Sequence, residues 1–154
     1  MKTVAWLAVV LVAAGAVSQG RAHDSNSQLT DSLRKYDMAS AKKDVETVKS
    51  LLAPEILLYE HSVRNDGLED AFENHLKPEI LESEGLQLDY SDVRITAGTD
   101  LALVTRQYKI HGKVQGKEIN AGGNETMVWQ RKGADWKIVH LHYSHACPRA
   151  SSSK

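Results

Sequence analysis

The sequence predicts a single α+β domain in which helices come first and an antiparallel sheet follows. Apolar residues recur at helical spacing as far as Leu76, and from Leu86 onward they alternate with polar residues, as in half-buried strands. The connectors between the alternating stretches are short and rich in turn residues, which favours hairpins over helical crossovers. A chain of 154 residues has the length of one domain and can bury a hydrophobic core.

Composition narrows the classes of function. The formal net charge is -1, so the chain lacks the strongly basic field that holds a nucleic-acid backbone. Cys147 is the single cysteine, which excludes an intramolecular disulfide framework and a cysteine-rich zinc site. Gly122-Gly123 is not followed by the Lys-Ser/Thr pair of a phosphate-binding loop, so no nucleotide cofactor is expected. The unusual count is seven histidines.

Residues 1–22 are predicted to be a secretory signal peptide. Lys2 precedes the uncharged run 4–17, which is shorter than the roughly 20 residues that a membrane-spanning helix needs. Small residues around Ala22 suit a cleavage site, and an earlier cut after Ser18 is an alternative. An uncleaved anchor is the competing interpretation. We expect a secreted or periplasmic protein that leaves the membrane after cleavage.

The mature chain is predicted to have three parts. Residues 23–28 form a flexible N-terminus, 29–147 form the domain, and 148–154 form a disordered tail. Cys147 lies beside this tail, where it is either a free thiol or the site of an intermolecular disulfide.

Three helices are predicted before the sheet. The first runs from Leu29 to about Ala41, and the second is capped by the Asp44 side chain and ended by Pro54. The third begins near Leu68, carries His75 on its buried face, and is interrupted by a proline.

Five strands are predicted. A short buried strand over 56–59 lies between the second and third helices, and the others form a meander. The meander strands cover residues 86–96, 101–113, 119–131 and 136–144. We expect them to form a curved sheet wrapped around the helices.

Two stretches of the chain resemble a known family. Residues 36–56 resemble the paired opening helices of the SnoaL-like branch of the nuclear transport factor 2-like (NTF2-like) superfamily, and residues 123–128 and 136–144 resemble its closing strands. The resemblance implies a cone-shaped barrel, in which three N-terminal helices close a curved antiparallel sheet around a pocket. It also implies a homodimer formed through the outer sheet face. Members include isomerases, dehydratases, cyclases and non-enzymatic modules, so the fold alone does not choose a function.

One exported subgroup of this branch looks especially similar. It carries a Tyr-Glu pair at the end of the first strand, a His-Leu pair on the third helix, and paired histidines before a final serine. The matching residues here are Tyr59-Glu60, His75-Leu76 and the pair His140 and His142. Asn74 stands where the subgroup often has a further histidine.

The histidine and carboxylate residues suggest a metal site. Alternation along the last strand places His140 and His142 on the same face as Trp136 and Ile138, with Cα atoms of the two histidines about 7 Å apart. The resemblance implies that Glu60 and His75 border the same pocket. The resulting hypothesis is a transition-metal site for copper, zinc or iron. Its ligands are Glu60, His75, His140 and His142.

Two other functions fit the same residues. In an acid–base enzyme acting on a small organic molecule, Glu60 or His142 would move a proton and a pocket tyrosine would donate to an oxyanion. The pocket candidates are Tyr59, Tyr108, Trp136 and Tyr143. In a non-catalytic ligand-binding or interaction module, the polar groups would be structural.

The remaining histidines are weaker candidates. His61 follows Glu60 directly, so in a continuous strand it would lie on the opposite face and point away from the site, unless the strand breaks there. His145 alternates away from His142, His111 lies at a hairpin end, and His23 would become N-terminal after cleavage at Ala22.

Overall fold

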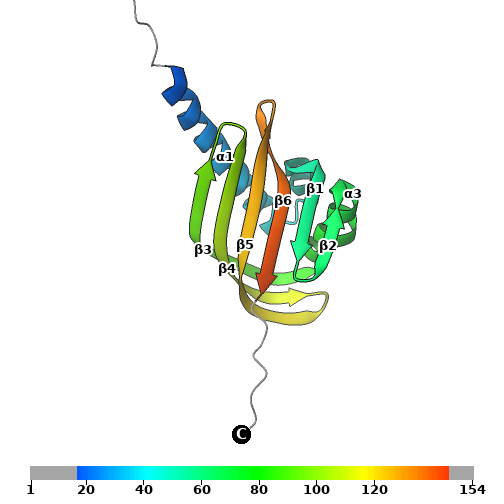
Figure 1. Ribbon diagram of the computed structural model, residues 1–154. Coiled ribbons are helices and arrows are strands. Elements are labelled where there is room, and N and C mark those ends of the chain that lie inside the picture. Colours follow the sequence, from blue (N-terminus) through cyan, green and yellow to red (C-terminus); the bar gives the residue numbers. More distant parts are fainter. Residues whose placement is uncertain (1–16, 146–154) are drawn as a thin grey trace, which may run out of the picture.

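The computed structural model describes residues 17–145, in which helices pack on one face of a curved sheet (Figure 1). Most of the predicted signal peptide, Cys147 and the predicted tail lie outside these residues. The helical elements are α1 (Val17–Ala41), α2 (Val45–Leu51), α3 (Gly67–Ala71), η1 (Phe72–Leu76) and α4 (Lys77–Leu81). The strands are β1 (Leu52–Glu60), β2 (Val63–Asp66), β3 (Ser83–Ala97), β4 (Leu101–Val114), β5 (Lys117–Lys132) and β6 (Asp135–His145).

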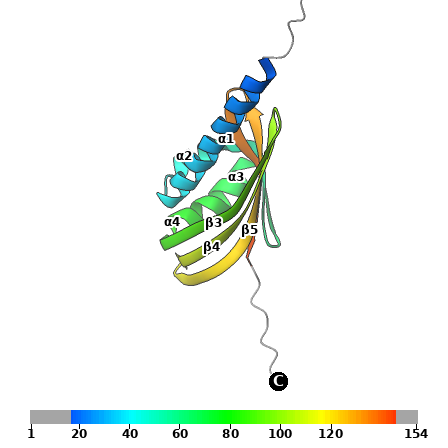
Figure 2. The same ribbon diagram turned by 90° about the vertical axis from the view of Figure 1, so that its left-hand side faces the viewer.

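The six strands form one open sheet in the order β2-β1-β6-β5-β4-β3. Neighbouring strands are antiparallel except β1 and β6, which run parallel. The α+β class is therefore confirmed, but the sheet is neither closed into a barrel nor purely antiparallel. The short connectors correctly predicted that β3 to β6 form an antiparallel meander. Strand β1 is separated from its partner β6 by the rest of the chain, so no short turn determines whether the two strands run parallel or antiparallel. Figure 2 shows the sheet curving around α1 and α4.

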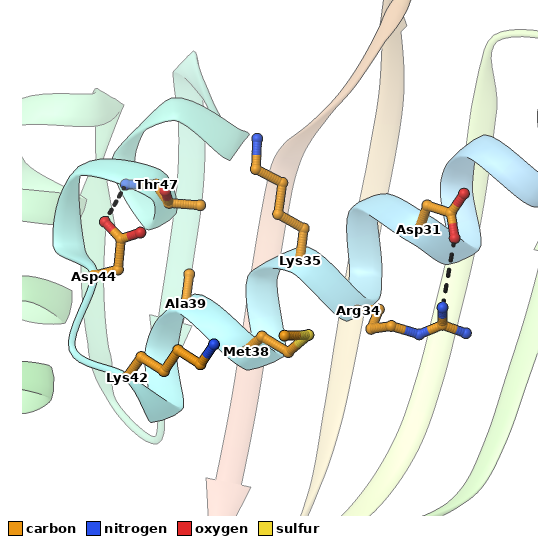
Figure 3. Close-up of a pocket in the computed structure, with 8 residues that line it drawn as sticks. All are labelled: Asp31, Arg34, Lys35, Met38, Ala39, Lys42, Asp44 and Thr47. Atoms are coloured by element: carbon orange, nitrogen blue, oxygen red, sulfur yellow. Dashed lines mark hydrogen bonds and ion pairs between the residues drawn. The ribbon is translucent and has the colours of Figure 1, made fainter.

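The helices follow the predicted apolar spacing with changed ends. Helix α1 begins at Val17 rather than at Leu29, so the polar residues before Leu29 are helical as well. Asp44 caps α2 as predicted, accepting a hydrogen bond from the Thr47 backbone N–H at 3.1 Å (Figure 3). Pro54 does not end this helix but lies within β1. Within residues 17–145, no helix combines the length and apolarity needed to cross a membrane.

The third helical segment contains a π-helical turn at its centre. Elements α3, η1 and α4 follow one another without a break, and η1 holds Phe72, His75 and Leu76 on its buried side. Such a wide turn carries an extra residue, and it is frequent at functional sites. It places the His75 ring inside the molecule, between the helix and the sheet.

The hydrophobic core fills the space between the helices and the inner sheet face. Its largest fully buried side chains come from the third helical segment and from β5 and β6: Phe72, Trp129 and Trp136. Leu29 and Val48 of α1 and α2 complete the core from the helix side. Burying such side chains contributes roughly 1.5–3 kcal/mol each, which holds the helices against the sheet.

A β-bulge in β6 decides which residues face the helices. Trp129 of β5 pairs with Ile138, but the preceding Val128 pairs with His140, so Val139 is an extra residue in β6. The inward alternation of Trp136 and Ile138 therefore continues at Leu141, Tyr143 and His145 instead of at His140 and His142. A shift of one residue moves every following side chain to the opposite face.

Gly123 allows two strands and a tyrosine ring to approach each other closely. A Cβ at this position would collide with the Ser144 carbonyl oxygen and would lie 2.7 Å from the Tyr108 hydroxyl. At neighbouring Gly122 a Cβ would meet only the Tyr108 carbonyl oxygen, at an ordinary 3.5 Å. The two glycines therefore differ in what they permit, although they are adjacent on β5.

We expect Gly123→Ala to destabilise the fold by about 1–3 kcal/mol, the usual cost of overpacking, because neither the backbone nor the ring can move freely. Gly122→Ala is the matched control and should change stability much less. Urea unfolding of the two variants measures the difference. Equal stability of the two variants would contradict the predicted close approach.

Candidate functional site

A buried polar network surrounds His75 on the inner face of the sheet. The His75 side chain is only 9% exposed, and its Nε2 lies 2.7 Å from the Tyr143 hydroxyl and 3.2 Å from Glu60 Oε2. Glu79 of α4 lies one helical turn after His75, and its Oε1 is 3.6 Å from His75 Nε2. The Tyr143 hydroxyl donates to Glu79 Oε2 at 2.9 Å. Strands β1 and β6 and the third helical segment thus bring four ionisable groups together.

The other nitrogen of His75 is held by a chain of hydrogen bonds. Asn65 Oδ1 lies 2.9 Å from His75 Nδ1, and the Asn65 amide also bonds to the Asp70 carboxylate. Because a carboxylate only accepts hydrogen bonds, Asn65 turns its NH₂ group toward Asp70 and its oxygen toward His75. Nδ1 therefore carries a proton, and Nε2 is the nitrogen that faces the carboxylates.

The environment separates the pKa values of the two carboxyl groups. The hydrogen bond from His75 lowers the pKa of Glu60, and the same contact raises the pKa of His75. Burial raises the pKa of Glu79, and the nearby Glu60 charge adds to this effect. A carboxyl group with a lowered pKa, an imidazole with a raised pKa and a second carboxyl group with a raised pKa thus lie side by side. Such divergent pairs are typical of acid–base sites.

His145 and Tyr108 extend the network toward the end of the sheet. The Tyr108 hydroxyl lies 2.7 Å from His145 Nδ1, and His145 Nε2 lies 3.4 Å from Glu60 Oε1. The ring of His61, in the turn after β1, lies 5.0 Å from the ring of His145 between centroids. Glu60 therefore contacts His75 through one oxygen and His145 through the other.

Two groups of residues within the described part of the chain could hold a metal ion. Both contain Glu60: one adds His75 and Glu79, and the other adds His61 and His145. Within each group the potential ligand atoms all lie within 4.8 Å of one another. Imidazole and carboxylate ligands suit zinc, copper and iron without choosing among them.

A second buried network links α1 to the sheet. Arg106 is 3% exposed and donates to both Asp37 carboxylate oxygens at 2.8 Å. It also donates to Glu125 Oε1, at 3.0 Å from Nη2, and its guanidinium carbon lies 3.3 Å from the centroid of the Tyr90 ring. Burial raises the pKa of Glu125, while the Arg106 charge opposes that shift. Each buried charge therefore has an opposite partner, as burial requires.

The structure does not bring the four predicted metal ligands together. In the parallel pairing of β1 with β6, Glu60 lies opposite Tyr143 on the inner face and Tyr59 lies opposite His142 on the outer face. His140 and His142 flank the Tyr59 ring, at centroid distances of 5.7 and 6.2 Å. The bulge at Val139 is the physical reason, because it reverses the alternation assumed for β6.

The pocket candidates divide between three environments. Tyr108 and Tyr143 belong to the inner network, Tyr59 lies on the outer face, and Trp136 is a core residue that is 1% exposed. His61 does not point away from the site, as alternation along a continuous strand predicted. Strand β1 ends at Glu60, and the backbone turns at His61.

Sequence reasoning missed several residues of the two networks: Asp37, Asn65, Glu79, Arg106 and Glu125. A signal was present for Arg106. It continues the inward alternation of Ala102 and Val104 on β4, so it is a charge at a core position, which calls for a buried partner.

A shallow groove on the outer side of α1 lies apart from these networks. It encloses about 350 Å³ and is lined by residues of α1 and of the start of α2 (Figure 3). Its side chains are mostly exposed and mix both charges, as in the Asp31–Arg34 pair at 3.7 Å. Such a surface gives no indication of a specific ligand.

The contact between His75 and Glu60 predicts a pH-dependent signature. In the wild type the pKa of His75 lies above its ordinary value of 6.5, because the Glu60 carboxylate stabilises the cation. The stability gained from this contact is present below the ordinary pKa and is lost as the pH rises through the raised one. Glu60→Gln should lower the pKa of His75, as measured by NMR titration of the imidazole resonances. An unchanged His75 titration in this variant would contradict the contact.

The Arg106 network predicts a large loss of stability on removal of its cation. Arg106→Met leaves Glu125 buried without a counter-charge and should cost about 3–5 kcal/mol in urea unfolding at pH 7. The deficit should shrink as the pH falls toward the carboxyl range, since protonated Glu125 no longer needs a partner. Arg94→Met is the control, because Arg94 is exposed beside Asp92. A deficit independent of pH would argue against this account.

Comparison with known proteins supports the same fold. A SnoaL-like domain model matches residues 30–148. The chain is similar in structure to a proposed dehydratase of the NTF2-like family from Streptomyces avermitilis, with a TM-score of 0.71, 18% identity, and coverage of 82% of this chain and 99% of that one. A proposed ketosteroid isomerase from Shewanella frigidimarina gives a TM-score of 0.67 at 24% identity, covering 74% and 92% of the two chains.

An NTF2-like superfamily protein from Salmonella enterica gives a TM-score of 0.68 at 19% identity, covering 90% of this chain and 99% of that one. A search of curated proteins finds no match to this sequence. Identities this low establish the fold and leave the chemistry to the site itself. The match to the family model covers most of the chain, and with the open curved sheet and its helices it shows that the protein belongs to the SnoaL-like domain family.

Proposed function

We propose that the protein is an enzyme that moves a proton on a small organic molecule, as isomerases and dehydratases do. The observation that carries the proposal is the inner network, in which the buried His75 ring lies within 2.7–3.6 Å of Tyr143, Glu60 and Glu79. General acid–base catalysis needs a base and an acid within reach of one substrate, with pKa values that differ. The inner network supports the proposal, because it lowers the pKa of Glu60 and raises the pKa values of His75 and Glu79.

Each residue of the network has a role in this proposal. Glu60, whose pKa is lowered by its contact with His75, is the base that removes a proton next to a substrate carbonyl. His75 and Glu79, whose pKa values are both raised, donate hydrogen bonds to the resulting enolate oxygen or a proton to a leaving hydroxyl group. Asn65 keeps the His75 ring oriented and is therefore a positioning residue.

The printed names of two structural relatives favour the same reaction class. One is a proposed dehydratase and the other a proposed ketosteroid isomerase, although neither likeness exceeds 24% identity. On a carbonyl substrate, both reactions can begin with removal of a proton next to the carbonyl group. Loss of water from a β-hydroxy ketone and migration of the double bond in a β,γ-unsaturated ketone both give a conjugated enone.

The test uses a panel of β-hydroxy ketones and β,γ-unsaturated ketones, with product followed by the ultraviolet absorption of the enone. We expect Glu60→Gln and His75→Gln each to lower kcat by about 10²–10⁴, the usual contribution of general acid–base groups. His142→Gln is the matched control, because this exposed histidine lies on the outer sheet face. EDTA should leave turnover unchanged. Equal loss in the His142 variant, or full activity in the Glu60 variant, would contradict the proposal.

Transition-metal binding is the second candidate function. It is favoured by the two groups of imidazole and carboxylate ligands that share Glu60. Copper, zinc or iron would then be the bound ion, and EDTA would abolish the function that the ion supports. His140 and His142 are not part of this candidate, because they lie on the opposite face of the sheet from Glu60.

We also propose export, as in the exported subgroup that the sequence resembles, and self-association, as the wider family resemblance implies. The uncharged run after Lys2 supports export. The outer face of β4 exposes Leu101 and Leu103, which are 53% and 42% accessible, and a second copy of the chain would cover them.

A further inference from the structure

We propose that Glu60, His61 and His145 hold one divalent transition-metal ion at the common end of β1 and β6. This inference rests on the second candidate function and names the ligands that would carry it. Because β1 and β6 are parallel, their carboxyl ends meet at one edge of the sheet, where Glu60 and His145 are the last strand residues. Ligand atoms of the three residues lie within 4.8 Å of one another.

The backbone conformation of His61 supports its assignment as a ligand. Glu60 pairs with Val63, so His61 and Ser62 form a two-residue turn between β1 and β2. His61 has φ of 51°, a left-handed conformation that glycine or asparagine adopts more readily. This conformation turns the imidazole toward His145, where the ring centroids lie 5.0 Å apart. An unfavourable backbone conformation that assembles ligands is a recognised feature of functional sites.

His145 is oriented in the way that metal-binding histidines usually are. Its Nδ1 is bonded to the Tyr108 hydroxyl at 2.7 Å, which fixes the ring and turns Nε2 toward Glu60. The Nε2 to Glu60 Oε1 distance of 3.4 Å is longer than a good hydrogen bond, so an ion between the two would not replace a strong contact. Gly123 permits this arrangement, since any Cβ there would collide with the Tyr108 ring.

The alternative group, Glu60 with His75 and Glu79, is less suited to an ion. Both nitrogens of His75 already have close partners, Asn65 and the Tyr143 hydroxyl, and Glu79 accepts the Tyr143 hydrogen bond. An ion would have to displace these bonds inside the protein. His61 is exposed, so the outer group is open to an ion from solvent.

Glu60 can serve both networks because its two oxygens face different ways. Oε2 lies 3.2 Å from His75, and Oε1 lies 3.4 Å from His145. Two imidazoles and one carboxylate are a known catalytic zinc set, and they leave a coordination position for water or for an oxygen of a ligand. Zn²⁺ is therefore the probe for the site.

The experiment uses the chain purified without an affinity tag, stripped of metal, equilibrated with Zn²⁺, and dialysed before its zinc content is measured. We expect the wild type to retain about one equivalent of zinc, and His61→Ala and His145→Ala each to lose it, because each removes a proposed ligand. His75→Ala and the exposed control His111→Ala should retain the equivalent. Circular dichroism checks that each variant is folded.

The outcomes separate the proposal from its alternatives. Zinc lost in His75→Ala but kept in His61→Ala would overturn the assignment and place the ion in the buried group, leaving metal binding intact. Failure of the folded wild type to retain zinc would overturn both the assignment and the second candidate function. Neither result bears on proton transfer, which the enone assay measures in the absence of metal. Zinc lost only in the His61 and His145 variants would support the proposed ligands.

Discussion

The extra residue at Val139 determines the chemistry of the whole inner face. Without it, the alternation that buries Trp136 and Ile138 would carry His140 and His142 inward and leave Tyr143 and His145 outside. With it, Tyr143 meets His75 and His145 meets Glu60, and two histidines that look like ligands in the sequence lie beside Tyr59 on the outer face. A single backbone irregularity thus selects which titratable groups share the interior.

Charges in that interior follow one rule, since each is compensated by a near neighbour. Arg106 lies between Asp37 and Glu125, and His75 lies among Glu60, Glu79 and Tyr143. The two networks nevertheless differ in kind. Arg106 keeps its proton at all accessible pH values, so its network is suited to holding α1 on the sheet. The His75 network is built around an imidazole, the side chain whose ordinary pKa of about 6.5 lies nearest to neutrality, which is why it carries the proposed chemistry.

The order of elements and the fold class were predictable from the sequence because they depend on periodicity. Apolar spacing in 29–41 and alternation in 101–113 report burial directly, and both elements are present close to where they were expected. The direction of β1 was not predictable, because its partner β6 lies at the far end of the chain. The start of α1 was also placed too late, since polar composition does not by itself forbid a helix.

The site was only partly predictable, and β6 shows why. Its sequence contains two apolar alternations that conflict: Trp136 and Ile138 are in one phase, and Leu141 and Tyr143 are in the other. A bulge reconciles them, but the sequence does not say which phase reaches the site. Glu60 and His75 were identified because a strand end and a helix face placed them. Partners such as Asn65 and Glu79 act through three-dimensional contacts that no spacing reveals.

The parallel pairing of β1 with β6 has a consequence for how the molecule forms. Leu58 and Leu141 are neighbours in the sheet, yet the other four strands of the sheet all lie between them in the chain. Contacts of such long sequence separation form slowly, because a long loop must close before they stabilise anything. Strand β1 therefore lacks its partner β6 until synthesis is nearly complete. Glu60 and Tyr143, which lie opposite each other on these two strands, can therefore meet only when the chain is nearly complete.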